Sequence, residues 1–188
     1  MIGANEFRAG KKVEIEGEPY LIIDAQHVKP GKGGAFVRSK LKNLRTGNLL
    51  ERTYRVGEQF DEPQIEERRL QYLYAQGDDY HFMDSQSYDQ LALTGPQLGE
   101  SRKFLKENME AVVMFFQGRP IGVVLPNFVE LLVADTAPGV RGDTATGGTK
   151  PATMETGTVI KVPFHINVGD LLKVDTRSGE YIERIRSA

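Results

Sequence analysis

Polar and apolar residues alternate in short runs along the first third of the chain. Residues 11–16 alternate strictly, and residues 20–23 form a more apolar run after a turn. The alternation returns over residues 35–44, and residues 49–56 bring the chain back after a glycine turn. A period of two is the pattern of a half-buried strand. These runs predict a small SH3-like (KOW-type) barrel over residues 1–62.

The run at residues 35–44 also separates charge from apolar surface. Its two faces carry Phe36, Arg38, Lys40 and Lys42 on one side, and Val37, Ser39 and Leu41 on the other. The whole chain holds 24 Lys and Arg against 26 Asp and Glu, yet residues 26–55 hold eight basic residues and one acid. Such asymmetry favours a polyanionic partner at one end, against the alternative of a solvated sheet face. We expect a basic, RNA-binding face made of Arg38, Lys40, Lys42, Arg52 and Arg55.

The loop between the second and third of these runs has a single lysine held between glycines. Its residues are Lys29, Pro30, Gly31, Lys32, Gly33 and Gly34. Glycine permits tight turns and close approach of a backbone to a partner. A Walker loop or a dinucleotide fingerprint would require a following helix, whereas a strand follows here. The pattern predicts a slender hairpin with the Lys32 amine at its tip, and the bland alternative is a solvated turn.

The middle of the chain reads as a second β unit, after a connector at residues 61–63. Strands are predicted at residues 70–74, 80–84, 111–116 and 121–125, with one short helix over residues 99–109 that Ser101 caps. Several strands with one short helix fit a five-stranded OB barrel. We therefore place a central OB-fold domain at residues 63–126.

The last third predicts a second OB-fold domain over residues 127–188. Its strands are expected at residues 129–134, 159–163, 171–175 and 180–185, and residues 135–158 read as a long polar loop. The glycines, hydroxyls and cations of this loop suit contacts to RNA phosphates or base edges. Candidate contacts in this domain are Arg141, Gly142, Asp143, Thr144, Gly147, Gly148, Lys150, Tyr181 and Arg184. Taken alone, a hairpin tip and surface strand residues explain them better than RNA contacts do.

Composition removes several classes of function. The chain has no Cys and no Trp, and His27, His81 and His165 are scattered without the spacing of metal ligands. No apolar run approaches the roughly 20 residues of a membrane span, and the first residues lack the apolar core of a signal peptide. No catalytic motif is present. We expect an all-β, monomeric cytoplasmic protein with no membrane partner, no metal and no cofactor, rather than an enzyme.

Motifs along the whole chain resemble the bacterial elongation factor P family. They are Phe-Arg-Ala-Gly at residues 7–10, Val-Lys-Pro-Gly-Lys-Gly-Gly-Ala-Phe at 28–36, Gln-Tyr-Leu-Tyr at 71–74, Pro-Asn-Phe-Val-Glu-Leu at 126–131, the stretch 142–153, and Val-Pro at 162–163 through Tyr181. Six motifs in order are far more specific than any one. One departure is His165, where the family usually has a large apolar or aromatic residue.

The resemblance implies an L-shaped, tRNA-like molecule of three barrels. It implies binding to both ribosomal subunits between the peptidyl and exit tRNA sites, with Lys32 beside the acceptor end of the peptidyl-tRNA. The implied task is rescue of ribosomes stalled at consecutive prolines, and the loop at residues 142–153 would face the exit-site mRNA codon. By the same resemblance a modifying enzyme acts on Lys32. The lysine is compatible with β-lysylation, an aminopentanol-type addition or no modification.

Three other interpretations stay open from sequence alone. A general single-strand RNA-binding protein would bind free oligonucleotides through the basic face, with a steep dependence on salt. A paralogue of elongation factor P would serve another client. An enzyme would require a pocket with perturbed titratable groups.

Overall fold

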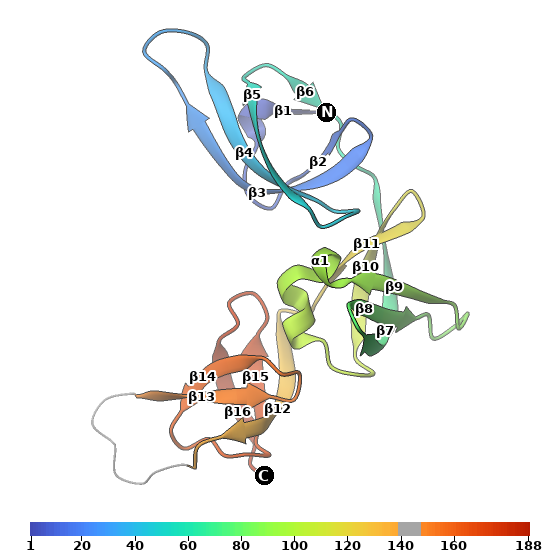
Figure 1. Cartoon of the computed structure of the whole chain (residues 1–188), viewed down its shortest axis with the longest axis vertical. Coiled ribbons are helices and arrows are strands. Elements are labelled where there is room, and N and C mark those ends of the chain that lie inside the picture. Colours follow the sequence, from blue (N-terminus) through green and yellow to red (C-terminus); the bar gives the residue numbers. More distant parts are fainter. Residues whose placement is uncertain (139–147) are drawn as a thin grey trace.

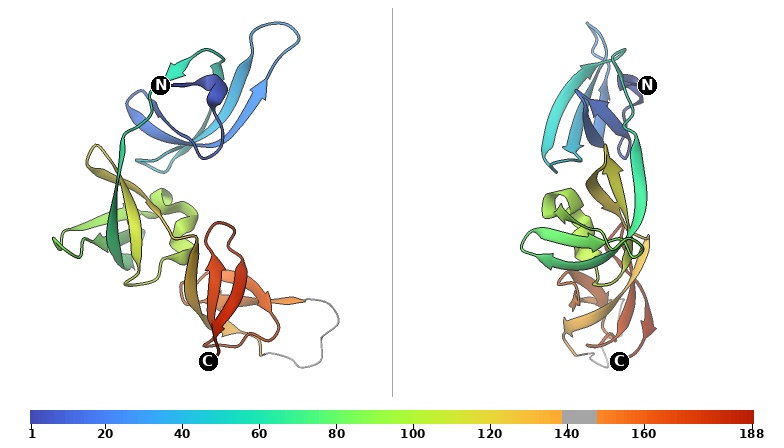
Figure 2. Two further views of the ribbon diagram at one scale, coloured as in Figure 1. Left: turned by 180° about the vertical axis from the view of Figure 1, so that it is seen from behind. Right: turned by 90° about the vertical axis from the view of Figure 1, so that its right-hand side faces the viewer.

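The computed structural model describes residues 1–138 and 148–188, and almost all of its regular structure is β-strand (Figure 1). Three sheet units follow one another along the long axis, so the first and the third lie at opposite ends (Figures 1 and 2). The predicted all-β, multi-barrel fold is confirmed. In the described part of the chain, no helix is long and apolar enough to cross a membrane.

The first unit is a twisted four-stranded sheet closed by a short two-stranded pair. Its elements are β1 (Ile2–Gly3), the 3-10 helix η1 (Ala4–Glu6), β2 (Lys12–Ile15), β3 (Glu18–Val28), β4 (Phe36–Asn43), β5 (Leu49–Arg55) and β6 (Gln59–Phe60). The order is β2-β3-β4-β5, and β1 pairs with β6. The rings of Phe7, Tyr54 and Phe60 pack together in its core, with ring centroids 4.9–5.8 Å apart. β3 starts earlier than predicted, because Glu16 and Gly17 alone make the turn with positive φ.

The second unit is a five-stranded sheet that curls on itself. Its elements are β7 (Ile65–Gln76), β8 (Asp79–Met83), β9 (Gln90–Thr94), the α-helix α1 (Gly95–Leu98), the 3-10 helix η2 (Gly99–Phe104), β10 (Glu110–Phe116) and β11 (Arg119–Val124). The order is β11-β10-β7-β8-β9, and β9 also approaches β11. This is the partly open barrel of an OB fold.

The predicted helix in this unit is correct only over residues 99–104, and its start, its end and its cap are wrong. The helix begins after Thr94, whose side chain accepts a hydrogen bond from the backbone N–H of Gln97, and Ser101 caps nothing. The helical segment ends at Phe104, and Leu105 is already extended. The signal is present in the sequence, because a threonine three residues before a glutamine is a capping box. β9, just before this cap, was not predicted.

The third unit repeats the topology of the second. Its strands are β12 (Phe128–Thr136), β13 (Thr149–Met154), β14 (Val159–Pro163), β15 (Leu171–Asp175) and β16 (Tyr181–Arg186). The order is β14-β13-β12-β15-β16, so the first strand of each unit is central in both. The prediction of a continuous polar loop up to residue 158 is wrong. Ala152 and Met154 on β13 are buried in the core, which a sequence rich in Thr and Gly had concealed.

Apolar clusters join the units. Leu44 from the end of β4 packs with Met114, Phe116 and Ile121 of the second unit. On the other side, Phe104 is buried within the core of the third unit. There the Thr156 hydroxyl also donates to the carbonyl of Lys103, at 2.6 Å. Each unit is therefore packed against the next, and the chain connections are not the only links.

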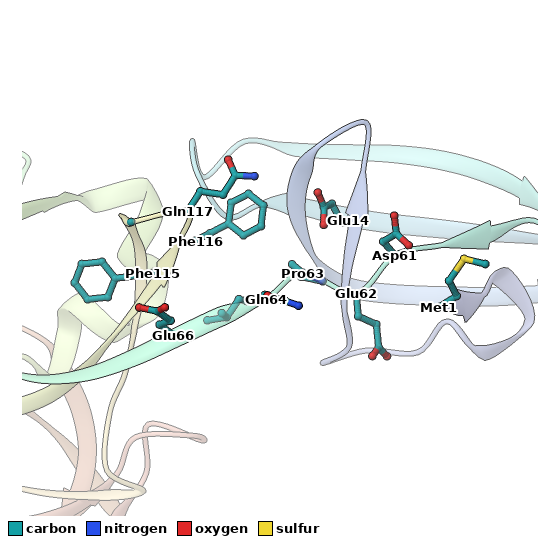
Figure 3. A pocket seen from close by; sticks show the side chains of 12 residues that line it. Met1, Glu14, Asp61, Glu62, Pro63, Gln64, Glu66, Phe115, Phe116 and Gln117 are labelled. Atoms are coloured by element: carbon teal, nitrogen blue, oxygen red, sulfur yellow. The ribbon is translucent and has the colours of Figure 1, made fainter.

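A cleft lies beside the connector between the first two units (Figure 3). Four carboxylates line it, those of Glu14, Asp61, Glu62 and Glu66. Figure 3 shows them spread along the connector rather than converging on one point. Within residues 1–138 and 148–188, no group of three or more His, Asp or Glu side chains is arranged to hold a metal ion.

Candidate nucleic-acid interface

The longest feature of the first unit is the hairpin of β3 and β4. The two strands pair from Tyr20 opposite Asn43 to Val28 opposite Phe36, with one irregularity between Ile22 and Asp24. Residues 29–35 then form the connecting loop, which projects at the end of the molecule away from the second unit (Figure 1). The local sequence favours this, because the alternating run that forms β4 begins directly after the glycines.

The loop is thin and open at its tip. A Cβ atom built on Gly31, Gly33 or Gly34 would meet no atom within 4 Å. Gly33 has a φ of +101°, which L side chains rarely adopt, so glycine is required there for conformation. Lys32 is exposed, and among the described residues it has no hydrogen-bond or ion-pair partner. Lys29 is exposed as well, whereas Pro30 is partly covered.

Two hydrogen bonds fix the base of this loop to the first unit. The His27 ring, as the tautomer protonated at Nε2, donates to the carbonyl of Phe7 at 2.9 Å. The Val56 N–H donates to the carbonyl of Ala35 at 3.1 Å. The sequence identified His27 only as a scattered histidine. Its role as an anchor depends on a residue 20 positions away, which no local pattern reveals.

The outer face of β4 is as predicted over its tip half. Arg38 and Lys40 are exposed, while Val37, Ser39 and Leu41 are buried. The Arg38 guanidinium lies 5.9 Å from the centroid of the Phe36 ring, and Arg55 sits opposite Phe36 on β5. Further from the tip the charge is balanced, because Lys40 lies between Asp24 on β3 and Glu51 on β5. The excess of positive charge is therefore concentrated towards the loop.

Arg52, assigned to this basic face, lies elsewhere. It is opposite Ser39, whose side chain is buried, so Arg52 lies on the other face of the sheet. Its guanidinium is 4.0 Å from the carboxylate of Glu16. The prediction that Arg52 shares a face with Arg38 and Lys40 is wrong. Arg52 and Arg55 are three positions apart on β5, so alternation alone places them on opposite faces. The register between β4 and β5 then decides that Arg55 shares a face with Arg38.

Lys42 is on the predicted face but turns into the junction with the second unit. It is partly buried, and its ammonium group would be only 3.0 Å from a Cβ at Gly99. Burial lowers the pKa of the Lys42 ammonium. Lys42 is therefore a junction residue, and the free basic surface consists of Arg38, Lys40 and Arg55.

The candidates in the third unit divide in three ways. Arg141, Gly142, Asp143, Thr144 and Gly147 lie outside the described residues. Gly148 is close to Phe164, whose ring would be 2.3 Å from a Cβ at that position. Tyr181 is partly buried against the core, and Arg184 lies 3.5 Å from the buried carboxylate of Asp170. The described candidates thus have structural contacts of their own.

Lys150 departs furthest from its predicted environment. The sequence places it in an exposed loop, but it lies on β13 with only 7% of its surface exposed. Its ammonium group donates to the carbonyls of Ala137 and Ile166, the latter at 2.6 Å. Burying an ammonium is costly unless it is hydrogen-bonded, and here two backbone oxygens accept from it. The Lys150 side chain is therefore buried in the third unit, with its ammonium group hydrogen-bonded to the backbone there.

His165, which departs from the family's usual apolar or aromatic residue, does not disturb the packing of the core. It is exposed, and the next residue, Ile166, is fully buried in its place. The core therefore does not depend on an apolar residue at position 165.

Comparison with known proteins agrees with the three-unit architecture. Residues 3–60 match the "Elongation factor P (EF-P) KOW-like domain", residues 65–123 the "Elongation factor P (EF-P) OB domain", and residues 129–184 "Elongation factor P, C-terminal". The elongation factor P of Pelotomaculum thermopropionicum is 58% identical over 98% of this chain and 100% of its own length. This chain belongs to the elongation factor P family. The family assignment makes it a translation elongation factor.

A second curated relative and one solved structure were also found to be similar to this chain. The elongation factor P of Natranaerobius thermophilus is 54% identical over 99% of both chains. Among solved structures, a eukaryotic translation initiation factor 5A from Methanococcus jannaschii is 28% identical, covering 63% of this chain and 88% of its own, with a TM-score of 0.48. The membership in the elongation factor P family rests on the sequence matches, which span the full chain.

Proposed function

We propose that this protein binds the ribosome between the peptidyl and exit tRNA sites and promotes peptide-bond formation at consecutive prolines. The Lys32 loop lies beside the acceptor end of the peptidyl-tRNA in this proposal. The observation that carries it is the exposed Lys32 at the tip of a long anchored hairpin, in a member of the elongation factor P family. Within residues 1–138 and 148–188 this lysine has no hydrogen-bond or ion-pair partner. Such a tip is narrow enough to enter a crowded RNA cavity.

The contribution of the loop is positioning rather than acid–base chemistry. Proline is a constrained secondary amine, so a prolyl acceptor and a prolyl nascent chain align poorly. A tenfold rate change corresponds to about 1.4 kcal/mol of barrier. Ordering the backbone of one residue costs about 1–2 kcal/mol. Holding the tRNA end in reactive geometry through a cationic hydrogen-bond donor is therefore of the right size to restore useful rates.

The partners belong to the same proposal. The ribosome supplies both subunits, the peptidyl-tRNA contacts the first unit, and the exit-site codon faces the third. A dedicated enzyme modifies Lys32, whose exposure leaves its amine accessible. The protein acts as a cytoplasmic monomer, without a metal or a cofactor and not as an enzyme.

A general single-strand RNA binder is less well supported. Such proteins track the backbone with a continuous basic groove. Here Asp24 and Glu51 flank Lys40, and Arg52 is on the opposite face, so the free basic surface is short.

The test is translation of a message encoding consecutive prolines in a reconstituted system that lacks this factor. Wild-type protein, purified from its own host to retain any modification, should restore synthesis, and Lys32→Ala should lose most of the effect. Lys161→Ala is the matched control, since Lys161 is an exposed lysine on β14 in the third unit. Equal rescue by Lys32→Ala would move the mechanism off the tip. No rescue by the native protein would refute the proposed function.

A further inference from the structure

A single side-chain amide bridges the first two units. Gln97, in α1, donates through Nε2 to the carbonyl of Arg45 at 2.8 Å and to the carbonyl of Pro120 at 3.2 Å. Arg45 lies in the turn between β4 and β5, and Pro120 is on β11. One amide group therefore joins a backbone oxygen of the first unit to one of the second.

The Arg45 carbonyl is held in place before Gln97 reaches it. The buried Asn43 accepts hydrogen bonds from the backbone N–H groups of Arg45 and Thr46, at 2.9 and 3.2 Å. The Arg45 side chain is also tied back to the sheet, with its Nε 2.8 Å from the carboxylate of Glu18. The guanidinium of Arg45 and the amide of Asn43 lower the pKa of Glu18, so this carboxylate is charged at neutral pH. The turn is a rigid acceptor rather than a flexible tip.

Gln97 is oriented from its own side as well. Its Oε1 accepts from the backbone N–H of Thr94 at 3.0 Å, in the capping box that starts α1. The amide oxygen is thus used in the cap, and both amide hydrogens are left for Arg45 and Pro120. A flipped amide would set its oxygen against two carbonyls, so the network fixes one orientation.

Close packing surrounds this bridge. A Cβ on Gly47 would lie 2.6 Å from the carbonyl carbon and the Cβ of Pro96, and the φ of Gly47 is +82°. Beside it, Leu44 is buried among residues of the second unit. We call the contact of Arg45 and Gly47 with Pro96 and Gln97 the elbow latch.

The covalent link between the two units is short and contains few constraints. The backbone N–H of Glu14 donates to the carbonyl of Asp61 at 2.8 Å, which holds the chain to the first unit up to that residue. β7 begins at Ile65, so only Glu62, Pro63 and Gln64 lie between (Figure 3). A three-residue connector acts as a hinge unless another contact fixes the angle, and the elbow latch supplies such a contact.

We propose that Gln97 is a positioning residue, which locks the Lys32 hairpin at one angle to the rest of the molecule. This rests on the proposed function. The nine residues from Tyr20 to Val28 span about 30 Å at roughly 3.3 Å per residue. A rotation of about 10° at the elbow would therefore move the tip by about 5 Å. Misplacement of reacting groups by about 1 Å can already cost a hundredfold in rate.

The decisive variant is Gln97→Glu. A glutamate keeps the acceptor oxygen that caps Thr94 but donates nothing to Arg45 or Pro120, so α1 forms while the latch loses its hydrogen bonds. Gln97→Ala removes both the capping contact with Thr94 and the hydrogen bonds to Arg45 and Pro120. The control is Gln90→Ala, an exposed glutamine of the same unit. Circular dichroism and thermal unfolding verify that each variant is folded.

The angle is measured directly with two spin labels. The chain has no cysteine, so Thr53→Cys and Ser85→Cys, both at exposed positions in different units, provide unique attachment sites. Pulsed electron paramagnetic resonance should give one narrow distance for the parent and for Gln90→Ala. Gln97→Glu and Gln97→Ala should broaden it. In the consecutive-proline assay, both Gln97 variants should lower the maximal rate about tenfold or more at saturating factor.

Two results would overturn the proposal. One is a Gln97→Glu distance distribution as narrow as that of the parent. The other is a broadened distribution with full rescue of translation. If the wild-type protein rescues nothing, the proposed function fails, whereas the distance distributions still decide whether the latch holds the arm.

Discussion

Replacing the buried Lys150 by methionine should destabilise the third unit. Methionine keeps the unbranched aliphatic stem and removes the ammonium group. The carbonyls of Ala137 and Ile166 then lose their donor inside a nearly closed site, where Lys150 is 7% exposed. Water cannot readily replace the ammonium without opening the strand.

The size of the effect results from three contributions, of which two destabilise the variant and one stabilises it. A hydrogen bond to a charged group is worth about 1.5–3 kcal/mol, and two are lost. Against this, methionine no longer requires a cation to be desolvated, a penalty of several kcal/mol for a buried ion. The two carbonyls left without a hydrogen-bond partner destabilise the variant by a further amount of about 1–3 kcal/mol. We expect a net loss of about 2 kcal/mol, which corresponds to about a 30-fold change in the opening equilibrium.

Hydrogen exchange of the intact protein, followed by mass spectrometry, measures this locally. Peptides from β13 and β14 should exchange about 30-fold faster in Lys150→Met, while peptides of the first unit stay unchanged. Lys161→Met is the matched control, because Lys161 is exposed on β14 opposite Pro151. It should shift the free energy of opening by less than about 0.5 kcal/mol. Equal exchange in both variants would refute the structural role argued for Lys150.

Two further predictions concern charge. Burial alone would raise the pKa of Asp170, but the N–H groups of Asn167 and Ala188 and the Arg184 guanidinium outweigh it and lower the pKa. A carboxylate with a lowered pKa stabilises the fold above its unfolded pKa of about 3.9, and this stabilisation is lost as pH falls through the folded pKa. In urea unfolding, Asp170→Asn should therefore lower the free energy of unfolding by about 1–3 kcal/mol at pH 7. The difference should be smaller below about pH 4. Arg38→Ala should weaken ribosome binding and lower its salt slope by about one, whereas Arg52→Ala should change neither; equal effects would refute the assignment of faces.

The sequence was most informative where a single strand determines by itself which face each side chain occupies. Alternation over residues 35–44 correctly separated Val37, Ser39 and Leu41 from Arg38 and Lys40, because side chains in a strand alternate between faces whatever its partner. The glycines of the Lys32 loop were equally readable. L side chains rarely adopt the φ of Gly33. The strand after the loop, β4, begins and ends within one residue of its prediction, whereas β3 runs to Val28, five residues beyond the predicted run at 20–23.

Prediction from the sequence failed where a contact between distant segments determines the environment of a side chain. The choice between Arg52 and Arg55 required the register between β4 and β5, and Lys42 required the position of Gly99 in another unit. Lys150 misled for a different reason. A lysine between threonine and proline is typical of a loop, and its burial depends on carbonyls at Ala137 and Ile166 that only the folded barrel brings together.

These failures share a consequence for how the tip is used. Of the free basic residues, Arg38 and Arg55 lie near the loop, while Lys42 and Arg45 are engaged at the elbow. The charge that looked like one continuous surface in the sequence is thus divided between a free end and a structural end of the same hairpin. In the function proposed above, the free end contacts RNA, and the structural end fixes where that contact is made. A hairpin that is rigid at its base presents Lys32 without the entropy cost of ordering a flexible arm on binding.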